Sequence, residues 1–401
     1  MTPRRNVALG IVFLTVFLDL IGFGIVLPLL PFFATSLGAS AFEIGLIIAS
    51  YSAMQFVFSP IWGRLSDRHG RRPILLIGLV GSGVSYIVFA LSRTIGVLLL
   101  SRVVAGIMGA NIPVAQAFIA DSTDNRNRAR GMGLIGAAFG LGFIVGPALG
   151  GILSRWGYAL PGLVAAGLSL SNAIAAFVYL PESYPPDRRR HVPSGAGTRA
   201  IVERLAEVQE ILGRVALREP IVAFFIATLG FAAFTATFPL FLDEPLGLSA
   251  VHAGAFFAVI GLIAAGVQGG LIGPVVERFG ERRTAAAGGL LLGSGLFVLA
   301  VWNGLGATLA LLLPIGGGWG LVAPSLQSLV SRRARPEEQG RVLGVNQSMS
   351  SAARVVGPIA GGWLFGAFGY RWQFLSAGAL LLLCASWILA MGDLASSGSP
   401  D

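Results

Sequence analysis

The sequence contains no lysine, a single cysteine and few charged residues of any kind. Asp, Glu, Lys and Arg make up 12% of the 401 residues, whereas hydrophobic residues make up 55% and the mean hydropathy is +0.78. Soluble domains carry about 25% charged residues, so this composition excludes an ordinary soluble protein and indicates a membrane protein. The one cysteine, Cys384, excludes an internal disulfide and argues against a cysteine-ligated metal site.

Motifs of nucleotide-binding and hydrolytic sites are also missing. The chain has no G-x-x-x-x-G-K-[ST], no H-E-x-x-H and no G-x-S-x-G. Its three histidines are scattered, at positions 69, 191 and 252. We therefore expect no cofactor, no metal and no enzymatic activity.

Apolar stretches fill most of the chain. A bilayer core of ~30 Å requires a helix of ~20 apolar residues. Twelve stretches meet this length: 7–33, 43–63, 73–92, 95–120, 130–154, 158–180, 219–242, 248–274, 284–302, 306–330, 341–366 and 370–391. The sequence thus predicts an all-α membrane protein with twelve transmembrane helices. The first stretch is too long for a signal peptide, so we expect it to remain as a span.

The basic charge follows membrane topology. If the amino terminus is cytoplasmic, 23 of the 28 arginines lie in cytoplasmic segments, Arg93, Arg155 and Arg371 lie outside, and Arg102 and Arg354 lie within spans. This is the pattern of the positive-inside rule. It predicts cytoplasmic termini and explains the net charge of +9 and the pI of 10.8 without a nucleic-acid partner.

The second half of the chain repeats the first. Seven residues recur 211 positions later: Pro113, Gln116, Arg130, Gly146, Pro147, Gly150 and Gly151 correspond to Pro324, Gln327, Arg341, Gly357, Pro358, Gly361 and Gly362. Residues 63–72 recur at 273–282. We predict two six-helix pseudo-repeats, 1–180 and 219–401, with the substrate path between them. Because one chain supplies both halves, we expect a monomer.

The segment 181–218 joins the two halves. Its first part is rich in proline, glycine and charge and is typical of a cytoplasmic linker. Its second part spaces Ile201, Leu205, Val208, Ile211 and Val215 as in a helix. This pattern predicts an amphipathic helix on the membrane surface, and a disordered tether is the alternative.

A dense charged loop, GRLSDRHGRRP (63–73), separates the second and third spans. We expect Gly63 to permit close helix approach, Gly70 to adopt a positive φ, and Asp67 to complement the dipole at the start of the third span. Carboxylates or lipid headgroups would pair with the arginines at positions 68, 71 and 72. A topological anchor would explain these arginines but not Asp67, the glycines or the recurrence at 273–283.

With this loop the chain resembles the major facilitator superfamily, and within it the twelve-span drug:proton antiporters that include the tetracycline exporters. The resemblance covers residues 7–392. In that family the loop is a cytoplasmic latch between the second and eleventh spans. The resemblance implies that Asp67 and Arg71 are latch residues, together with Arg68, Arg72 and the flanking glycines, and that Asp121 and Arg341 are their charge partners.

A glycine-rich motif, GAAFGLGFIVGPALGG (136–151), follows in the fifth span. Gly142, Gly146 and Gly150 form a flat helix face that another helix can approach closely, and Pro147 permits bending. Packing alone would explain the glycines. The motif also resembles the signature of family members that export. The resemblance implies a role in antiport for five of its residues: Gly142, Gly146, Pro147, Gly150 and Gly151.

Three charged residues lie deep within the spans. Arg102, in a motif that resembles the family's R-x-x-x-G-x-x-G, lies ~10 Å into the fourth span. Asp19 lies near mid-membrane, where a carboxylate points to a functional site, and Arg354 lies ~20 Å into the eleventh span. We expect Asp19 to bind the coupling proton, Arg102 to set its proton affinity and Arg354 to pair with it. Anchoring by Arg102 and a static ion pair at Asp19 are the alternatives.

Aromatic and weakly polar residues of the spans are the candidates for a substrate cavity. They are Phe23, Gln55, Asn111, Phe224, Phe231, Thr235, Phe238, Gln268, Trp319, Gln327, Asn346 and Gln347.

These observations predict a proton-coupled exporter of amphiphilic drug-like molecules in a bacterial inner membrane, working by alternating access. The alternative is a transporter of a metabolite such as a sugar or amino acid, although a sugar site would need more polar groups. Tetracycline exporters carry further acids in the third and ninth spans. This sequence has none there, which argues against tetracycline as the substrate.

Overall fold

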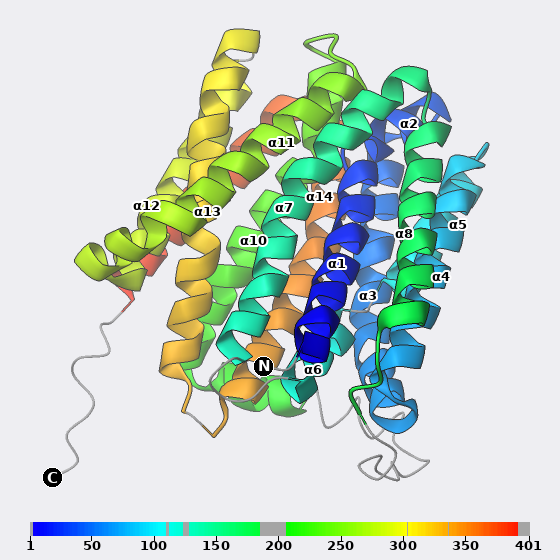
Figure 1. Ribbon diagram of the computed structural model, residues 1–401. Helices are drawn as coiled ribbons and strands as arrows, with labels where there is room; N and C mark the ends of the chain where they lie inside the picture. Colours follow the sequence, from blue (N-terminus) through cyan, green and yellow to red (C-terminus); the bar gives the residue numbers. More distant parts are fainter. Residues whose placement is uncertain are drawn as a thin grey trace, which may run out of the picture. The chain divides into compact units, whose positions relative to one another are not determined.

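The described residues fold into helices. The computed structural model describes residues 3–109, 112–122, 128–184, 206–302, 304–335 and 337–391, and within these ranges every regular element is a helix (Figure 1). They are α1 (Pro3–Val26), α2 (Leu30–Ser36), α3 (Ala41–His69), α4 (Arg71–Ala90), α5 (Ile95–Met108), α6 (Ile112–Ser122), α7 (Arg128–Leu153), α8 (Ala159–Tyr179), α10 (Val215–Asp243), α11 (Ala250–Gly266), α12 (Ile272–Val301), α13 (Leu305–Arg333) and α14 (Gln339–Ala390), with a short 3-10 helix at Ser154–Trp156 and a π-helical segment at Val267–Leu271. Residues 206–213 are also helical. Asn111, Ile201 and Leu205 lie outside the described residues.

The chain divides into two compact units. Unit 1 comprises Met1–Val192 and Ala236–Gly261, and unit 2 comprises Pro193–Thr235 and Leu262–Asp401. Unit 1 therefore holds α1 to α8, the end of α10 and most of α11. The domain boundaries expected from the sequence follow the repeat, and they stay a prediction.

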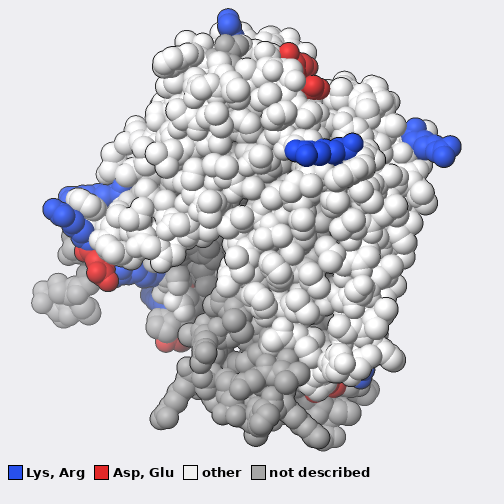
Figure 2. Space-filling view, turned by 45° about the horizontal axis from the view of Figure 1, so that its top comes forward, with Lys and Arg blue, Asp and Glu red and all other residues white. Residues whose placement is uncertain are grey.

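Nine of the described helices are long and apolar enough to cross a membrane, or ten if α1 and α2, which meet at a 40° bend, form one span. The sequence predicted twelve. Part of the difference lies in Ala250–Val301, which counts as one candidate but covers two predicted spans that meet at Gly280. The predicted span 341–366 is not among the nine, because Arg354 and neighbouring polar residues lower its hydropathy. On the face shown in Figure 2, broad areas carry no Lys, Arg, Asp or Glu, as expected of a surface in contact with lipid.

Glycines in the left-handed region mark equivalent turns in the two halves. All described residues with positive φ are glycines, and they form three pairs separated by 209, 210 and 212 positions: Gly38 with Gly247, Gly70 with Gly280, and Gly157 with Gly369. Each pair lies where one helix ends and the next begins. Since a residue with a Cβ is strained there, the chain uses the same residue type for the same turn in both copies.

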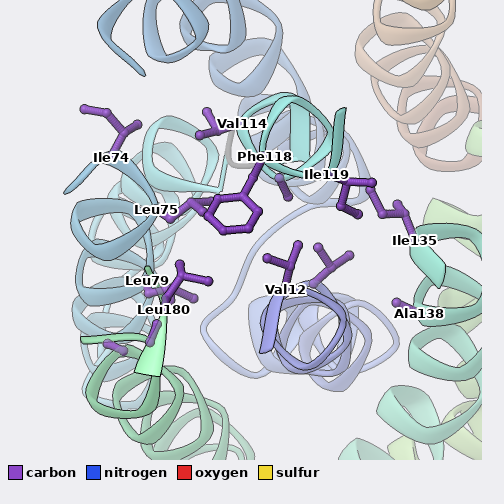
Figure 3. Packing of buried hydrophobic residues seen from close by; sticks show 14 of the residues in the cluster. Val12, Ile74, Leu75, Leu79, Val114, Phe118, Ile119, Ile135, Ala138 and Leu180 are labelled. Carbon is purple, nitrogen blue, oxygen red and sulfur yellow. The ribbon is translucent and has the colours of Figure 1, made fainter. Parts of the chain in front are cut away.

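Buried side chains hold α1 against its neighbours in unit 1. Val12 of α1, Leu75 of α4 and Phe118 of α6 are fully buried in one cluster, to which α7 and α8 also contribute (Figure 3). Leu20 belongs to the same cluster. The segment of α1 that carries Asp19 is therefore packed along one side.

Candidate functional site

Arg71 is the centre of the charged loop. Its Nη1 donates to Asp67 at 2.5 Å and to the Ser66 hydroxyl at 2.6 Å, and its Nε donates to Asp121 at 3.0 Å. The Arg71 side chain is 8% exposed. Buried charges are stable when they are paired and hydrogen-bonded, and this one connects the end of α3, the start of α4 and the end of α6. The structure thus brings together Asp67, Arg71 and Asp121, and their role as a latch stays a prediction.

Glu182, directly after α8, caps the start of α4. Its carboxylate accepts hydrogen bonds from the backbone N–H groups of Arg71 at 2.9 Å and Arg72 at 3.3 Å, where the helix dipole favours an anion. The prediction that Asp67 complements the dipole at the start of α4 is wrong, because Asp67 lies in the last turn of α3. The signal for Glu182 was an acid immediately after the sixth predicted span.

The turn between α3 and α4 has one glycine that backbone geometry requires. Gly70 has φ 102°, which confirms the positive φ expected of it. Gly63 was expected to permit close approach, but a Cβ there would meet no atom within 4 Å. Arg68 is exposed, whereas Arg72 donates to the carbonyl of Phe177.

The second copy of this loop carries the same ion pair with its charges exchanged. Glu281 occupies the position of Arg71, Arg332 that of Asp121, and the two form a salt bridge. Ser328 also donates to Glu281, at 3.4 Å. Each copy therefore ties its loop helix to the end of the following helix, with opposite polarity.

Arg341 pairs within unit 2. It donates to Glu207 at 2.9 Å and to Glu210 at 3.0 Å, while Arg214 bonds to Glu210 at 2.8 Å and to Glu338 at 2.6 Å. The hydrogen bond from Arg341 lowers the pKa of Glu210, and that from Arg214 lowers the pKa of Glu338. Within unit 2 the linker acids neutralise Arg341, and its pairing with the charged loop stays a prediction.

The linker helix packs against protein. Ile211 is 2% exposed and joins a cluster with Val330 of α13 and Val342 of α14, and Val208 and Leu212 pack beside it. The prediction that this helix lies on the membrane surface was wrong for the described part, because its apolar side is already covered.

Asp19 lies partly buried within α1 and makes no hydrogen bond or ion pair with any described residue. Tyr86 of α4 lies close by. A Cβ on Gly22, one turn after Asp19, would lie 2.8 Å from the Tyr86 hydroxyl, and Asp19 interacts electrostatically with that hydroxyl.

Arg102 of α5 is 3% exposed and lacks an acidic partner among the described residues. Its guanidinium carbon lies 5.0 Å from the ring centroid of Phe89 and 5.8 Å from that of Tyr86. Nε donates to Ser101 at 3.2 Å, and Nη2 is buried without a hydrogen-bond partner in the described chain. An uncompensated buried cation is costly, so the role as a mere anchor loses support.

Side chains of α3 bind the end of α5. Gln55 donates to the Gly109 carbonyl at 3.3 Å and Trp62 to the Ile107 carbonyl at 2.6 Å. These carbonyls have no partners within a helix that ends there. A Cβ on Gly106 would lie 2.4 Å from the Tyr51 carbonyl oxygen, so the glycine lets α3 and α5 touch. Phe23 packs against the same Tyr51, with the rings tilted and their centroids 5.0 Å apart.

The glycine motif of α7 has two packing faces. A Cβ on Gly142, Gly146 or Gly150 would lie within 2.8 Å of an atom of α1, and Figure 1 shows the two helices side by side. Gly151 faces α11, where a Cβ would lie 3.0 Å from the Cα of Gly254. The motif therefore positions α7 between α1 and α11, and its role in antiport stays a prediction.

The remaining cavity candidates differ in exposure. Phe231 and Trp319 are partly buried and stack in parallel at 4.1 Å. Asn346 is buried, and its Oδ1 lacks a hydrogen bond in the described chain. Thr235 is partly buried and donates to its own helix. Three glutamines are exposed: Gln268, Gln327 and Gln347.

Phe238 was wrongly placed among the cavity residues. It is fully buried among the rings of Phe241, Phe256 and Phe257, so it belongs to the core.

Arg354 donates to Ser350 at 2.8 Å and to Ser351 at 3.2 Å on its own helix. Its pairing with Asp19 stays a prediction.

Known proteins resemble this chain along nearly its whole length. The tetracycline resistance protein, class C, of Escherichia coli is 34% identical over 95% of this chain and 96% of its own. Multidrug resistance protein 2 of Bacillus subtilis (strain 168) is 28% identical over 92% and 91%. The crystal structure of the human organic anion transporter MFSD10 (TETRAN) superposes with a TM-score of 0.72 at 28% identity, covering 97% of this chain and 100% of the other.

The family model of the Major Facilitator Superfamily matches residues 12–357 and 269–396. The match includes every charged cluster described above. The chain is a multi-pass membrane protein that transports small molecules and is not an enzyme, and it belongs to the Major Facilitator Superfamily.

Proposed function

We propose that the protein is a proton-coupled exporter of amphiphilic drug-like molecules in a bacterial inner membrane, with cytoplasmic termini and a monomeric working unit. The relatives named for tetracycline and multidrug resistance support export. The arginine distribution supports the orientation.

The observation that carries the proposal is Asp19. It is a carboxylate within an apolar helix, without an ion pair in the described chain, and it lies beside a tyrosine whose ring faces a buried arginine. A static ion pair would engage Asp19 permanently. A carboxylate that must take up and release a proton needs instead an interaction that forms and breaks during the cycle.

The proposed cycle is alternating access. Substrate enters a cavity open to the cytoplasm, and a proton arriving at Asp19 from outside favours substrate release. The loop around Arg71, whose ion pairs hold the ends of α3, α4 and α6 together, closes the cytoplasmic side in this cycle, as the family resemblance implies. The proton gradient supplies the work.

The substrate class follows from the span residues. Phe231, Trp319 and Phe23 offer aromatic surface, and glutamines offer a few polar contacts. The α4 positions where tetracycline exporters would carry an acid hold apolar or hydroxyl residues, including buried Ser82 and Ser85. We therefore propose a broad amphiphilic class rather than tetracycline.

The test is transport in proteoliposomes that contain the purified protein under an imposed pH gradient. Ethidium serves as the cationic probe and Nile red as the neutral one. Asp19→Asn is compared with wild type, and Asp243→Asn, the same change at the end of α10, is the matched control.

We expect gradient-dependent dye accumulation with wild type and Asp243→Asn and none with Asp19→Asn. If wild type moves neither dye, the multidrug proposal fails and metabolites are tested next. If Asp19→Asn accumulates dye as wild type does, the coupling carboxylate lies elsewhere.

A further inference from the structure

Tyr86 contacts the surroundings of two charged residues within the spans of unit 1, Asp19 and Arg102. It is 5% exposed, its hydroxyl lies over Gly22 on α1, and its ring faces the guanidinium of Arg102 on α5. Neither charge has an ion-pair partner among the described residues. A buried arginine and a membrane-embedded carboxylate therefore meet the same aromatic side chain.

We propose that Tyr86 is a positioning residue for proton coupling: its hydroxyl donates a hydrogen bond to the ionised carboxylate of Asp19 while its ring holds Arg102 in place. This inference rests on the proposed function and names the group that sets when Asp19 binds its proton.

Helix geometry puts the hydroxyl within reach. Residues three apart on a helix have Cβ atoms ~5–6 Å apart on one face, and Asp19 and Gly22 have this spacing. The Tyr86 hydroxyl lies 2.8 Å from the Cβ position of Gly22. The two groups are not hydrogen-bonded in this structure, so a rotation of the Asp19 side chain makes the bond that we propose. Protonation then releases it.

Because Gly22 has no Cβ, the Tyr86 hydroxyl has room to lie beside α1. Any Cβ there would also lie 3.0 Å from two ring carbons of Tyr86. The ring of Tyr86 also faces the guanidinium of Arg102, which lies over the ring of Phe89 as well. Gly22 therefore permits the contact, and Tyr86 makes it.

Few other titratable groups face this pair. Tyr51 of α3 and Arg102 of α5 both interact electrostatically with Tyr86. Among the described side chains of the helices packed on α1, α7 has none, while α6 has Asp121 and α8 has Tyr179, each near the end of its helix. A change in the proton affinity of Asp19 after a change at Tyr86 thus has one origin.

The test measures protonation of Asp19 directly. Dicyclohexylcarbodiimide modifies protonated carboxyl groups in apolar surroundings, and mass spectrometry of the peptide that contains Asp19 gives the pH midpoint of labelling. Tyr86→Phe keeps the ring beside Arg102 and removes only the hydroxyl. Gly22→Ala keeps Tyr86 and displaces its hydroxyl. Tyr158→Phe, on a partly buried tyrosine directly before α8, is the control.

We expect Tyr86→Phe to raise the labelling midpoint by about one pH unit, which is a tenfold change in proton affinity, because a hydrogen bond to the charged form favours ionisation. Gly22→Ala should raise it similarly, with little further effect in the Tyr86→Phe background. Tyr158→Phe should leave it unchanged. The ethidium transport profile should shift in the same direction as the labelling.

An unchanged midpoint in Tyr86→Phe would overturn the inference, even if Gly22→Ala failed to fold. An equal shift in Tyr158→Phe would overturn it as well, since the effect would then be nonspecific. If labelling shifts as expected while wild type transports no dye, the inference stands and the proposed substrate class fails.

Discussion

Replacing Gly150 with alanine would place a methyl group 2.3 Å from the carbonyl oxygen of Ile25 on α1. Ordinary contact begins at about 3.4 Å, so α1 and α7 would have to separate by about 1 Å. Overpacking of this size costs about 1–3 kcal/mol, against a gain of about 1 kcal/mol for alanine over glycine inside a helix. We expect Gly150→Ala to destabilise the protein or, at best, to leave its stability unchanged.

Gly140→Ala is the matched control in the same helix. A Cβ there meets nothing within 4 Å, so only the helix-propensity gain remains, and this variant should be the more stable by about 1–3 kcal/mol. Thermal unfolding in detergent, followed by size-exclusion chromatography, measures the difference. Equal stability of the two variants would refute the argument that Gly150 is a contact glycine.

Two further predictions concern the charged loops. Gly70→Ala should destabilise the protein by about 1–3 kcal/mol, because φ 102° strains a residue with a Cβ, whereas Gly63→Ala should be nearly silent in the same thermal assay. Equal effects would show that the turn does not require glycine. Glu281→Arg should destabilise unit 2, and adding Arg332→Glu should recover about 1 kcal/mol, since Glu281 is 14% exposed but Arg332 is 64% exposed. A double variant no more stable than the single one would contradict the assigned ion pair.

The helical architecture was predictable because hydropathy and span length are local properties of the sequence. The turn at Gly70 was predictable for the same reason, since a glycine between two helices with flanking charges indicates a positive φ. Asp121 as a partner of Arg71 was expected only from the family resemblance, and the structure brings the two together.

Long-range partners were not predictable. Glu182 reaches the start of α4 from 111 residues away, and no spacing rule connects the two segments. Arg341 forms salt bridges with acids of the linker. The sequence alone does not indicate whether these acids or the acids of the charged loop are its partners. The predictions of close helix approach at Gly63 and of a cavity position for Phe238 were wrong for a related reason, because a residue type does not reveal which neighbours surround it.

The two ion pairs of opposite polarity also affect how a chain with an internal repeat assembles, because helices of one repeat must not pair with helices of the other. The two six-helix halves that the repeat predicts could exchange equivalent helices when they are inserted into one bilayer. If α4 took the place of α12 beside α13, Arg71 would oppose Arg332, and if α12 took the place of α4 beside α6, Glu281 would oppose Asp121. Each exchange sets like charges against each other, and a like-charge contact disfavours the wrong partner. The opposite polarity of the two pairs thus gives each half a means to select its own helices during assembly.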